Sequence, residues 1–345
     1  LNSIPLLRSF DSSHQSFKEL IELQISEPLI ELKLSKKIKT LGSITNDISK
    51  QVKLQYEENP YPRWRYGSYS KNIKFTVNQV INNEIKPNYI KHNVDNEKLK
   101  ILIAGCGTGS QILQTQRYKN SKITAIDLSS SSLSYAQRKI NELGITNIEL
   151  IQMDILQVDL LEEEFNIIEC GGVLHHMKDP ESGLKILLHN LSANGFIKLG
   201  LYSQLARKDI DIARRYIVSE RLQPTQKDIR TFRQKVISSE FKNANSLKRL
   251  PDFYSLSEFR DLCFNVQEHR FTIKKLLETL NSHKLKFEGF LLSQSVKSIY
   301  AKYFPEDQSQ TNLENWIMFE EKHPDTFIGM YQFWASKKSR LQRKI

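Results

Sequence analysis

Three glycines alternate along one stretch of the chain, and their spacing could place a ligand directly against the backbone. Residues 99–104 read LKILIA, an apolar run typical of a buried strand, and Gly105, Gly107 and Gly109 follow at once. Glycine lets a ligand approach the backbone where any Cβ would intrude. A buried strand that ends in a glycine turn and opens a helix predicts a site for a nucleotide-like ligand.

Two acidic residues follow the next two predicted strands and could hold parts of such a ligand. Asp127 ends the second strand, twenty residues after Gly107, and its carboxylate can accept hydrogen bonds from both hydroxyls of a ribose. Asp154 follows the third strand and could accept a hydrogen bond from an adenine amino group, with Ile155 packed on the ring. These residue types therefore indicate a ligand that contains an adenosine.

A second glycine pair, Gly171 and Gly172, ends the fourth predicted strand, where an amino-acid moiety or the reacting atom of the ligand would lie. All these features fall at the carboxyl ends of successive strands, where open α/β sheets bind ligands. The dinucleotide fingerprint does not fit, because Ser110 occupies its third glycine position. We interpret Cys106, inside the first glycine turn, as a small filling residue and not as a nucleophile.

Strands that alternate with helices must position these residues. Such an alternation predicts a parallel sheet with helices on both faces. The predicted strands are 99–104, 122–127, 148–153, 165–170 and 196–202, and the helices between them are 110–118, 131–143 and 181–191.

The pattern changes after the fifth strand. Residues 207–241 read as two basic amphipathic helices with Ile210, Ala213 and Ile217 on one face, which indicates an insertion over the carboxyl edge of the sheet. A loop-rich stretch (250–271), a helix (272–280) and a strand (287–292) are predicted to follow, with a last strand (330–336) at the edge of the sheet.

The segment before the first strand contains an unusual patch. Residues 1–55 predict two or three helices without chemistry of their own, and residues 56–64 then read YEENPYPRW. Two prolines flank Tyr61 and impose a stiff, extended backbone. The patch is either a rigid linker anchored by Trp64 or a wall of the ligand site, since aromatic rings beside a cation suit a sulfonium or an ammonium.

Composition restricts the class of protein. No apolar run approaches the roughly 18 residues of a membrane span, and three cysteines without CxxC spacing argue against a disulfide framework or a zinc site. We predict a cytoplasmic protein without a metal site.

The net charge is +11, but most Lys and Arg are scattered along the sequence. Residues 203–250 are an exception, with 12 basic against 5 acidic residues. Because the chain begins with Leu1, we expect a fragment or a processed product.

The segments ILIAGCGTGS, TAIDLS, MDI and IIECGGVLHHM resemble the successive motifs of class I S-adenosylmethionine-dependent methyltransferases. The resemblance spans residues 99–202 and implies an α/β, Rossmann-like, seven-stranded, mostly parallel sheet with a reversed last strand, and S-adenosylmethionine as cofactor. The cofactor-binding residues that it implies are Gly105, Cys106, Gly107, Gly109, Asp127, Leu128, Asp154, Ile155, Gly171, Gly172 and Val173.

A narrower resemblance lies outside this core. The segments YEENPYPRW, FYSLSEFRDLCFNVQEHRFT and HPDTFIGMYQFW look like bacterial methyltransferases that are often fused behind tetratricopeptide repeats, a layout similar to that of protein-lysine methyltransferases acting on surface proteins. The resemblance implies a protein acceptor, a lysine amine, and an upstream repeat region that joins the N-terminal helices.

Methyl transfer to an amine needs an acceptor that has lost its proton, and burial lowers the pKa of an amine. Aromatic walls could hold the neutral amine and disperse the sulfonium charge; the candidates are Tyr61, Trp64, Tyr202 and Tyr254. His175 or His176 could act as a base near the transfer point, or could only pack there. Glu268 and His269 form a second candidate pair on the acceptor side.

Other functions remain open at this point. A small-molecule or tRNA methyltransferase could use the basic insertion to bind phosphates, and a non-catalytic module could have kept only the cofactor site. We divide the chain into an N-terminal helical segment (1–55), a lid segment (56–98), a cofactor-binding core (99–203), a helical insertion on the acceptor side (204–271) and a C-terminal part that completes the sheet (272–345).

Overall fold

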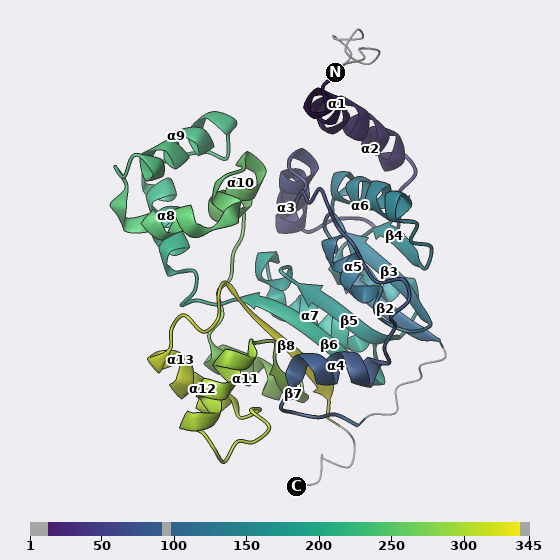
Figure 1. The fold of residues 1–345 in the computed structure, drawn as a ribbon, viewed down its shortest axis with the longest axis vertical. Coiled ribbons are helices and arrows are strands. Elements are labelled where there is room, and N and C mark those ends of the chain that lie inside the picture. The colour runs from purple at the N-terminus through teal and green to yellow at the C-terminus, as the bar shows by residue number, and fades with distance from the viewer. Residues whose placement is uncertain (1–12, 92–97, 339–345) are drawn as a thin grey trace.

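The computed structural model describes residues 13–91 and 98–338, and its strands form a single twisted sheet (Figure 1). The strands are β1 (Lys39–Thr40), β2 (Leu99–Ala104), β3 (Ser121–Asp127), β4 (Ile148–Gln152), β5 (Phe165–Gly171), β6 (Leu191–Tyr202), β7 (Leu285–Phe290) and β8 (Met330–Lys337). Their order in the sheet is β1-β4-β3-β2-β5-β6-β8-β7.

The sheet is mostly parallel with a reversed last strand, which confirms the predicted fold class. Strand β8 runs antiparallel to both β6 and β7, and the other pairings are parallel. The prediction that the last strand lies at the edge is wrong, because β8 lies between β6 and β7. Its Tyr331, Phe333 and Trp334 are fully buried, as expected of a strand covered on both faces. Strand β1 pairs with β4 and adds an eighth strand to the seven expected, within the part of the chain that the structure describes.

Helices cover both faces of the sheet. Alternate residues of β2 point to opposite faces. Ile101 packs under α4 (Val77–Ile85), α5 (Ser110–Thr115) and α6 (Ser130–Leu143), and Leu102 packs under α7 (Pro180–His189) and α11 (Ile273–Ser282). The helices are α1 (Gln15–Ile21), α2 (Glu27–Ser35), α3 (Asp47–Glu58), α4 (Val77–Ile85), α5 (Ser110–Thr115), α6 (Ser130–Leu143), α7 (Pro180–His189), α8 (Lys208–Ser219), α9 (Gln226–Ile237), α10 (Leu256–Phe264), α11 (Ile273–Ser282), α12 (Gln294–Tyr303) and α13 (Leu313–Lys322).

The insertion between β6 and α11 forms a lobe beside α3 (Figure 1). It leaves and rejoins the core at one point, because Ser203 and Phe271 form a β-bridge. Its helices α8 and α9 bury Ile210, Ala213 and Ile217 in a hydrophobic core of their own, which confirms the predicted amphipathic pattern. Residues 250–271 are not simply loop-rich as predicted, since they contain α10 and a short 3₁₀ helix (Pro251–Phe253). Phe259 and Leu262 of α10 pack into the insertion core, so tertiary burial stabilises a helix whose sequence signal is short.

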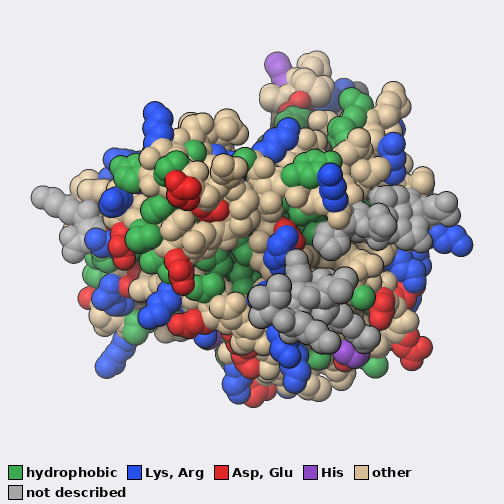
Figure 2. Space-filling model, turned by 90° about the horizontal axis from the view of Figure 1, so that it is seen from below, with side chains coloured by type: hydrophobic (Ala, Val, Ile, Leu, Met, Phe, Trp, Pro, Cys, Tyr) green, Lys and Arg blue, Asp and Glu red, His purple; other side chains and the backbone are tan. Residues whose placement is uncertain are grey.

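The surface mixes both signs of charge. On the face shown in Figure 2, Lys and Arg side chains lie among acidic and apolar ones, as their scatter along the sequence predicts. In residues 13–91 and 98–338, no helix has the length and apolar character needed to cross a membrane.

Candidate active site

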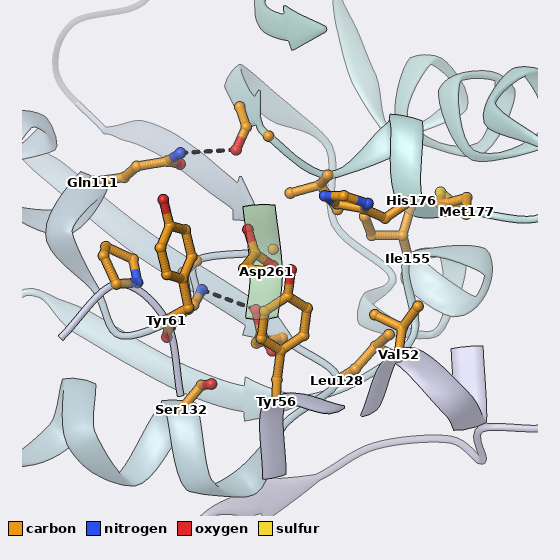
Figure 3. A pocket seen from close by; sticks show the side chains of 18 of the residues that line it. Val52, Tyr56, Tyr61, Gln111, Leu128, Ser132, Ile155, His176, Met177 and Asp261 are labelled. Carbon is orange, nitrogen blue, oxygen red and sulfur yellow. Dashed lines mark hydrogen bonds between the residues drawn. The ribbon is translucent and has the colours of Figure 1, made fainter. Parts of the chain in front are cut away.

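A cavity of about 250 Å³ lies between the strand ends of the core, α3 and α10 (Figure 3). It extends along the carboxyl ends of the strands, from Asp154 after β4 to Tyr202 at the end of β6. The lining residues are Ser49, Val52, Tyr56, Tyr61, Pro62, Gly105, Cys106, Gly107, Ser110, Gln111, Asp127, Leu128, Ser132, Met153, Asp154, Ile155, Gly171, Gly172, Val173, His176, Met177, Tyr202, Asp261 and Met330. Every residue predicted to bind the cofactor is in this set except Gly109, the N-cap of α5, which lies against Ala136 of α6.

The glycine turn lies directly against the lid segment. Gly107 has a φ of +51°, and a Cβ there would lie 2.8 Å from the carbonyl oxygen of Tyr61, so this position requires glycine. The Thr108 hydroxyl donates a hydrogen bond to the carbonyl of Pro62, and Nε1 of Trp64 donates to the carbonyl of Thr108 at 3.2 Å. The lid segment is therefore fixed to the turn by two hydrogen bonds, each from a side chain to a backbone carbonyl.

Asp127 organises the turn before any ligand binds. Its Oδ2 accepts a hydrogen bond from the amide of Gly107 at 2.8 Å, and its Oδ1 accepts one from the amide of Ser129 at 2.9 Å. Each carboxylate oxygen can accept a further hydrogen bond, so both ribose hydroxyls still find an acceptor. Burial raises the pKa of Asp127 to about 6.

The neighbouring strand supplies the place for an adenine. Asp154 is 3% exposed and accepts a hydrogen bond from the Leu156 amide through Oδ1 at 3.0 Å, which holds its side chain at the start of a 3₁₀ helix. Leu128, Met153 and Ile155 line the cavity beside it. Apolar side chains around one carboxylate suit a flat heterocycle with an exocyclic amine.

Helix α3 closes the cavity over this site. Glu57 accepts hydrogen bonds from the backbone amides of Ser130 and Ser131 at 2.7 and 2.9 Å, at the start of α6. A carboxylate at a helix N-terminus is favourable, because the amides there lack intrahelical partners. Val52 and Tyr56 on the same helix line the cavity.

The four aromatic candidates lie in different places. Tyr61 lines the cavity, and its hydroxyl donates a hydrogen bond to Oδ2 of Asp252 at 3.2 Å. Trp64 lies outside the lining, edge-on to Tyr135 and against the glycine turn. Tyr254 is 68% exposed and does not line the cavity. Of these three, only Tyr61 reaches the cavity.

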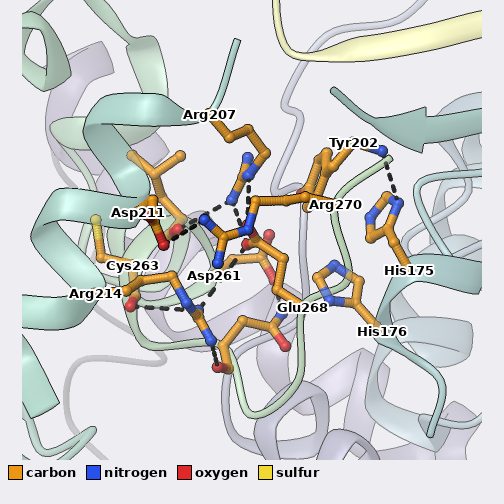
Figure 4. Close-up of polar contacts among 12 residues, drawn as sticks. His175, His176, Tyr202, Arg207, Asp211, Arg214, Asp261, Cys263, Glu268 and Arg270 are labelled. Carbon is orange, nitrogen blue, oxygen red and sulfur yellow. Dashed lines mark hydrogen bonds and ion pairs between the residues drawn. The ribbon is translucent and has the colours of Figure 1, made fainter. Parts of the chain in front are cut away.

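Tyr202 lines the cavity with both ring faces covered (Figure 4). The His175 imidazole stacks on the ring with 3.6 Å between centroids, and the guanidinium carbon of Arg207 lies 3.6 Å from the ring centroid. The ring therefore has no free face for a cation–π contact with a ligand. It can present only its edge and its hydroxyl to the cavity.

The two adjacent histidines have different hydrogen bonds. His176 lines the cavity, and its Nδ1 lies 2.6 Å from the carbonyl oxygen of Gln267, so Nδ1 carries the proton and Nε2 keeps a lone pair. Burial lowers the pKa of His176, which keeps the ring neutral. His175 is fully buried outside the lining, and its Nδ1 accepts the backbone N–H of Tyr202 at 3.3 Å. Burial lowers its pKa far below the ordinary value.

Glu268 and His269 lie behind the cavity wall. The side chain of Glu268 is 1% exposed and binds the Arg207 guanidinium at both oxygens, at 2.9 and 2.6 Å. Nε2 of His269 lies 3.0 Å from the carbonyl oxygen of Met177. Neither residue lines the cavity. Glu268 joins the two ends of the insertion through Arg207, and His269 contacts the core through Met177.

Tyr56 and Asp261 are among the residues of the cavity wall that sequence reasoning did not predict. The Tyr56 hydroxyl donates a hydrogen bond to Oδ1 of Asp261 at 2.6 Å, across 205 residues of sequence. Asp261 lies in the stretch that we predicted to be loop-rich. Helical spacing places it opposite Phe259 and Cys263 on α10, so no periodic signal in the sequence marks it as buried.

The structure separates the effects expected of Trp64 and Tyr61. Trp64→Ala should weaken cofactor binding about tenfold and lower the melting temperature, because it removes the hydrogen bond and packing that support the turn at Thr108.

Tyr61→Phe should lower turnover with little change in cofactor affinity, because the backbone contact with Gly107 remains. Calorimetric titration and initial rates would test both; unchanged cofactor affinity in Trp64→Ala would contradict this assignment.

The residues of the cavity fit S-adenosylmethionine. Asp127 offers two free acceptor positions to a ribose, and Asp154 with its apolar neighbours suits an adenine. An added Cβ at Gly172 would meet no protein atom within 4 Å, so open space lies beside the backbone where the amino-acid part of the cofactor would extend.

Comparisons with known proteins agree with this geometry. Residues 101–195 match a family model described as a methyltransferase domain. An uncharacterized protein of Synechococcus is 31% identical over 202 residues, 55% of this chain and 48% of that protein. A tRNA U34 carboxymethyltransferase of Nautilia profundicola is 25% identical over 53% of this chain and 61% of that protein. The chain thus spans about half the length of the first of these relatives and less than two thirds of the second.

A solved structure is similar over most of the chain. The structure of PKMT2 from Rickettsia typhi in complex with AdoHcy has a TM-score of 0.57 and 17% identity, and the match covers 80% of this chain and 56% of that one. This similarity concerns the fold. Together with the matched family model and the cofactor geometry, it identifies what the chain carries: a class I S-adenosylmethionine-dependent methyltransferase domain.

Proposed function

We propose that the protein transfers the methyl group of S-adenosylmethionine to the side-chain amine of a lysine on a protein acceptor. One observation carries the choice of an amine. Three carboxylates line the cavity, those of Asp127, Asp154 and Asp261. No Lys or Arg lines it among the described residues, although the net charge of the chain is +11. Asp127 and Asp154 suit the cofactor, which leaves Asp261 for the acceptor.

The same charge pattern disfavours the tRNA alternative. Proteins bind nucleic acids mainly by placing Lys and Arg on phosphates. Among the residues that the structure describes, the cavity wall offers a phosphate-bearing acceptor no Lys or Arg and one additional carboxylate. The name of the Rickettsia protein, PKMT2, is that of a protein-lysine methyltransferase, and its fold supports the proposal for a protein acceptor.

The residues of the chain align the reactants and remove a proton. The bound cofactor supplies an activated methyl group on a sulfonium, and transfer in line forms a carbon–nitrogen bond as the carbon–sulfur bond breaks. Asp127 and the glycine turn fix the cofactor, and α3 with the lid segment excludes water from the cavity. Nε2 of His176 is positioned to take the proton that the lysine ammonium must lose, because Gln267 fixes the tautomer.

His176→Gln should lower turnover at neutral pH by roughly tenfold to a thousandfold, the usual range for loss of a general base. The low pKa of His176 keeps it unprotonated at neutral pH, so the wild-type base is available there. The variant should recover as pH rises toward the lysine pKa of about 10.4, where solution removes the acceptor proton. Rates across pH 6–10 test this; parallel profiles would exclude His176 as the base. Exposed His189→Gln is the matched control.

Incubation of the protein with labelled S-adenosylmethionine and host lysate tests the proposed function. After separation into protein, RNA and small-molecule fractions, we expect the label in protein, and hydrolysis should release methylated lysine. Asp127→Ala in the same lysate should give no label. Label that enters only RNA or small molecules would overturn the proposal.

A further inference from the structure

The carboxylate of Asp261 has one oxygen fully engaged and one oxygen free. Oδ1 accepts hydrogen bonds from the Tyr56 hydroxyl at 2.6 Å, from Nδ2 of Asn265 at 3.0 Å and from Nε2 of Gln55 at 3.3 Å. Oδ2 has no hydrogen-bond or ion-pair partner among the described residues. The residue is 5% exposed and lines the cavity (Figure 3). The fixed oxygen orients the free one.

The cations near Asp261 are engaged elsewhere. Arg207 binds both oxygens of Glu268 and covers the face of the Tyr202 ring that His175 leaves open (Figure 4). Arg260, the preceding residue, forms an ion pair with Glu58 at 2.5 Å. A buried carboxylate without a paired cation is costly. A cationic ligand in the cavity would offset that cost.

The groups around Asp261 accept hydrogen bonds. The Tyr61 hydroxyl donates its proton to Asp252, so its oxygen can accept a hydrogen bond, whereas the Tyr56 oxygen already accepts one from Nδ2 of Asn265 at 3.3 Å. Nε2 of His176 is also an acceptor, because its Nδ1 faces the carbonyl of Gln267. An alkylammonium has three N–H donors and no acceptor. The two hydrogen-bonding patterns are complementary.

We propose that Asp261, on the insertion, is the binding site for the ammonium group of the acceptor before it loses its proton. The ligand class is a primary alkylammonium, the form of a lysine side chain at neutral pH. The inference rests on the proposed function for its place in the reaction, but the ammonium site stands on its own geometry. Under this proposal, the insertion and not the cofactor-binding core selects an acceptor with an amine over one with a hydroxyl or a carboxylate.

Titration of n-butylammonium, which matches the lysine side chain from Cβ to Nζ, into the protein saturated with S-adenosylhomocysteine tests the proposal. We expect the wild type to bind it at least tenfold more tightly than n-butanol, the neutral alcohol with the same carbon chain. Asp261→Asn keeps the shape and an oxygen for Tyr56 but removes the charge. It should weaken n-butylammonium binding at least tenfold and leave the affinity for S-adenosylhomocysteine within twofold.

Glu258→Gln is the matched control, since it removes a charge from the same helix outside the cavity lining and should leave both affinities unchanged. Equal binding of the two probes by the wild type would overturn the proposal even if Asp261→Asn did not fold. Unchanged n-butylammonium affinity in a folded Asp261→Asn would also overturn it.

The failure of this proposal is distinguishable from failure of the proposed function. Label found in RNA, together with Asp261-dependent n-butylammonium binding, would overturn the lysine acceptor and keep the ammonium site. Methylated lysine in protein, together with an unchanged KM in Asp261→Asn, would keep the function and overturn the ammonium site.

Discussion

Asp127→Ala should weaken S-adenosylmethionine binding at least a hundredfold and abolish methyl transfer. The carboxylate is positioned to accept two ribose hydroxyls, and hydrogen bonds to a charged group contribute about 1.5–3 kcal/mol each. Their joint loss corresponds to roughly 10²- to 10⁴-fold in affinity. The substitution also releases the amides of Gly107 and Ser129, which Asp127 holds at 2.8 and 2.9 Å. Isothermal titration calorimetry measures the affinity directly.

Two variants define the cause of that loss. Asp127→Asn keeps the shape of the side chain but loses the charge, so its cofactor affinity should lie between those of the wild type and Asp127→Ala. Glu149→Ala, on the neighbouring strand β4, removes an exposed carboxylate that pairs with Lys39, and it should bind the cofactor like the wild type. Wild-type affinity in Asp127→Ala would show that the ribose assignment is wrong.

Gly172→Ala should reduce cofactor affinity at least tenfold while leaving the protein folded. Gly172 has a φ of +80°, and an added Cβ would meet no protein atom within 4 Å. Because Gly172 lines the cavity at the end of β5, the new methyl group would occupy space that the cofactor needs. The positive φ alone costs an alanine roughly 1–2 kcal/mol of stability.

Gly144→Ala separates the two effects of that substitution. Gly144 ends α6 with a φ of +66°, and an added Cβ there also meets no atom within 4 Å, but the residue lies outside the active-site cavity. Both variants should lose similar stability in thermal unfolding, and only Gly172→Ala should lose cofactor affinity. Equal cofactor affinity in the two variants would place the ligand away from Gly172.

The two ends of the cavity come from different parts of the chain. Residues 101–195, which match the family model, include Asp127, Asp154 and the glycine turn. Tyr56, Tyr61, Tyr202 and Asp261 lie outside that range. A family match therefore identifies the cofactor and leaves the acceptor open, because the end of the cavity proposed for the acceptor is formed by α3, the lid segment and the insertion.

Local sequence was sufficient to predict that the residues proposed to bind the cofactor lie at one edge of the sheet. The strands β2 to β5 follow from short apolar runs, and the parallel arrangement aligns their carboxyl ends, so Gly107, Asp127 and Asp154 converge without further information. Each of these residues acts within a few residues of its own strand end. Backbone geometry and side-chain periodicity are local properties, and they determine such positions.

The acceptor end was decided by the tertiary structure. Tyr56 and Asp261 are 205 residues apart and meet only because the insertion packs beside α3. The position of β8 inside the sheet and the coverage of both Tyr202 faces likewise depend on segments that are distant in sequence. Residue patterns identify which side chains are buried, but the choice of burial partner depends on the packing of the whole chain. The sequence by itself thus predicted the cofactor and the residues proposed to bind it, and only the folded chain brought Asp261 to the same cavity.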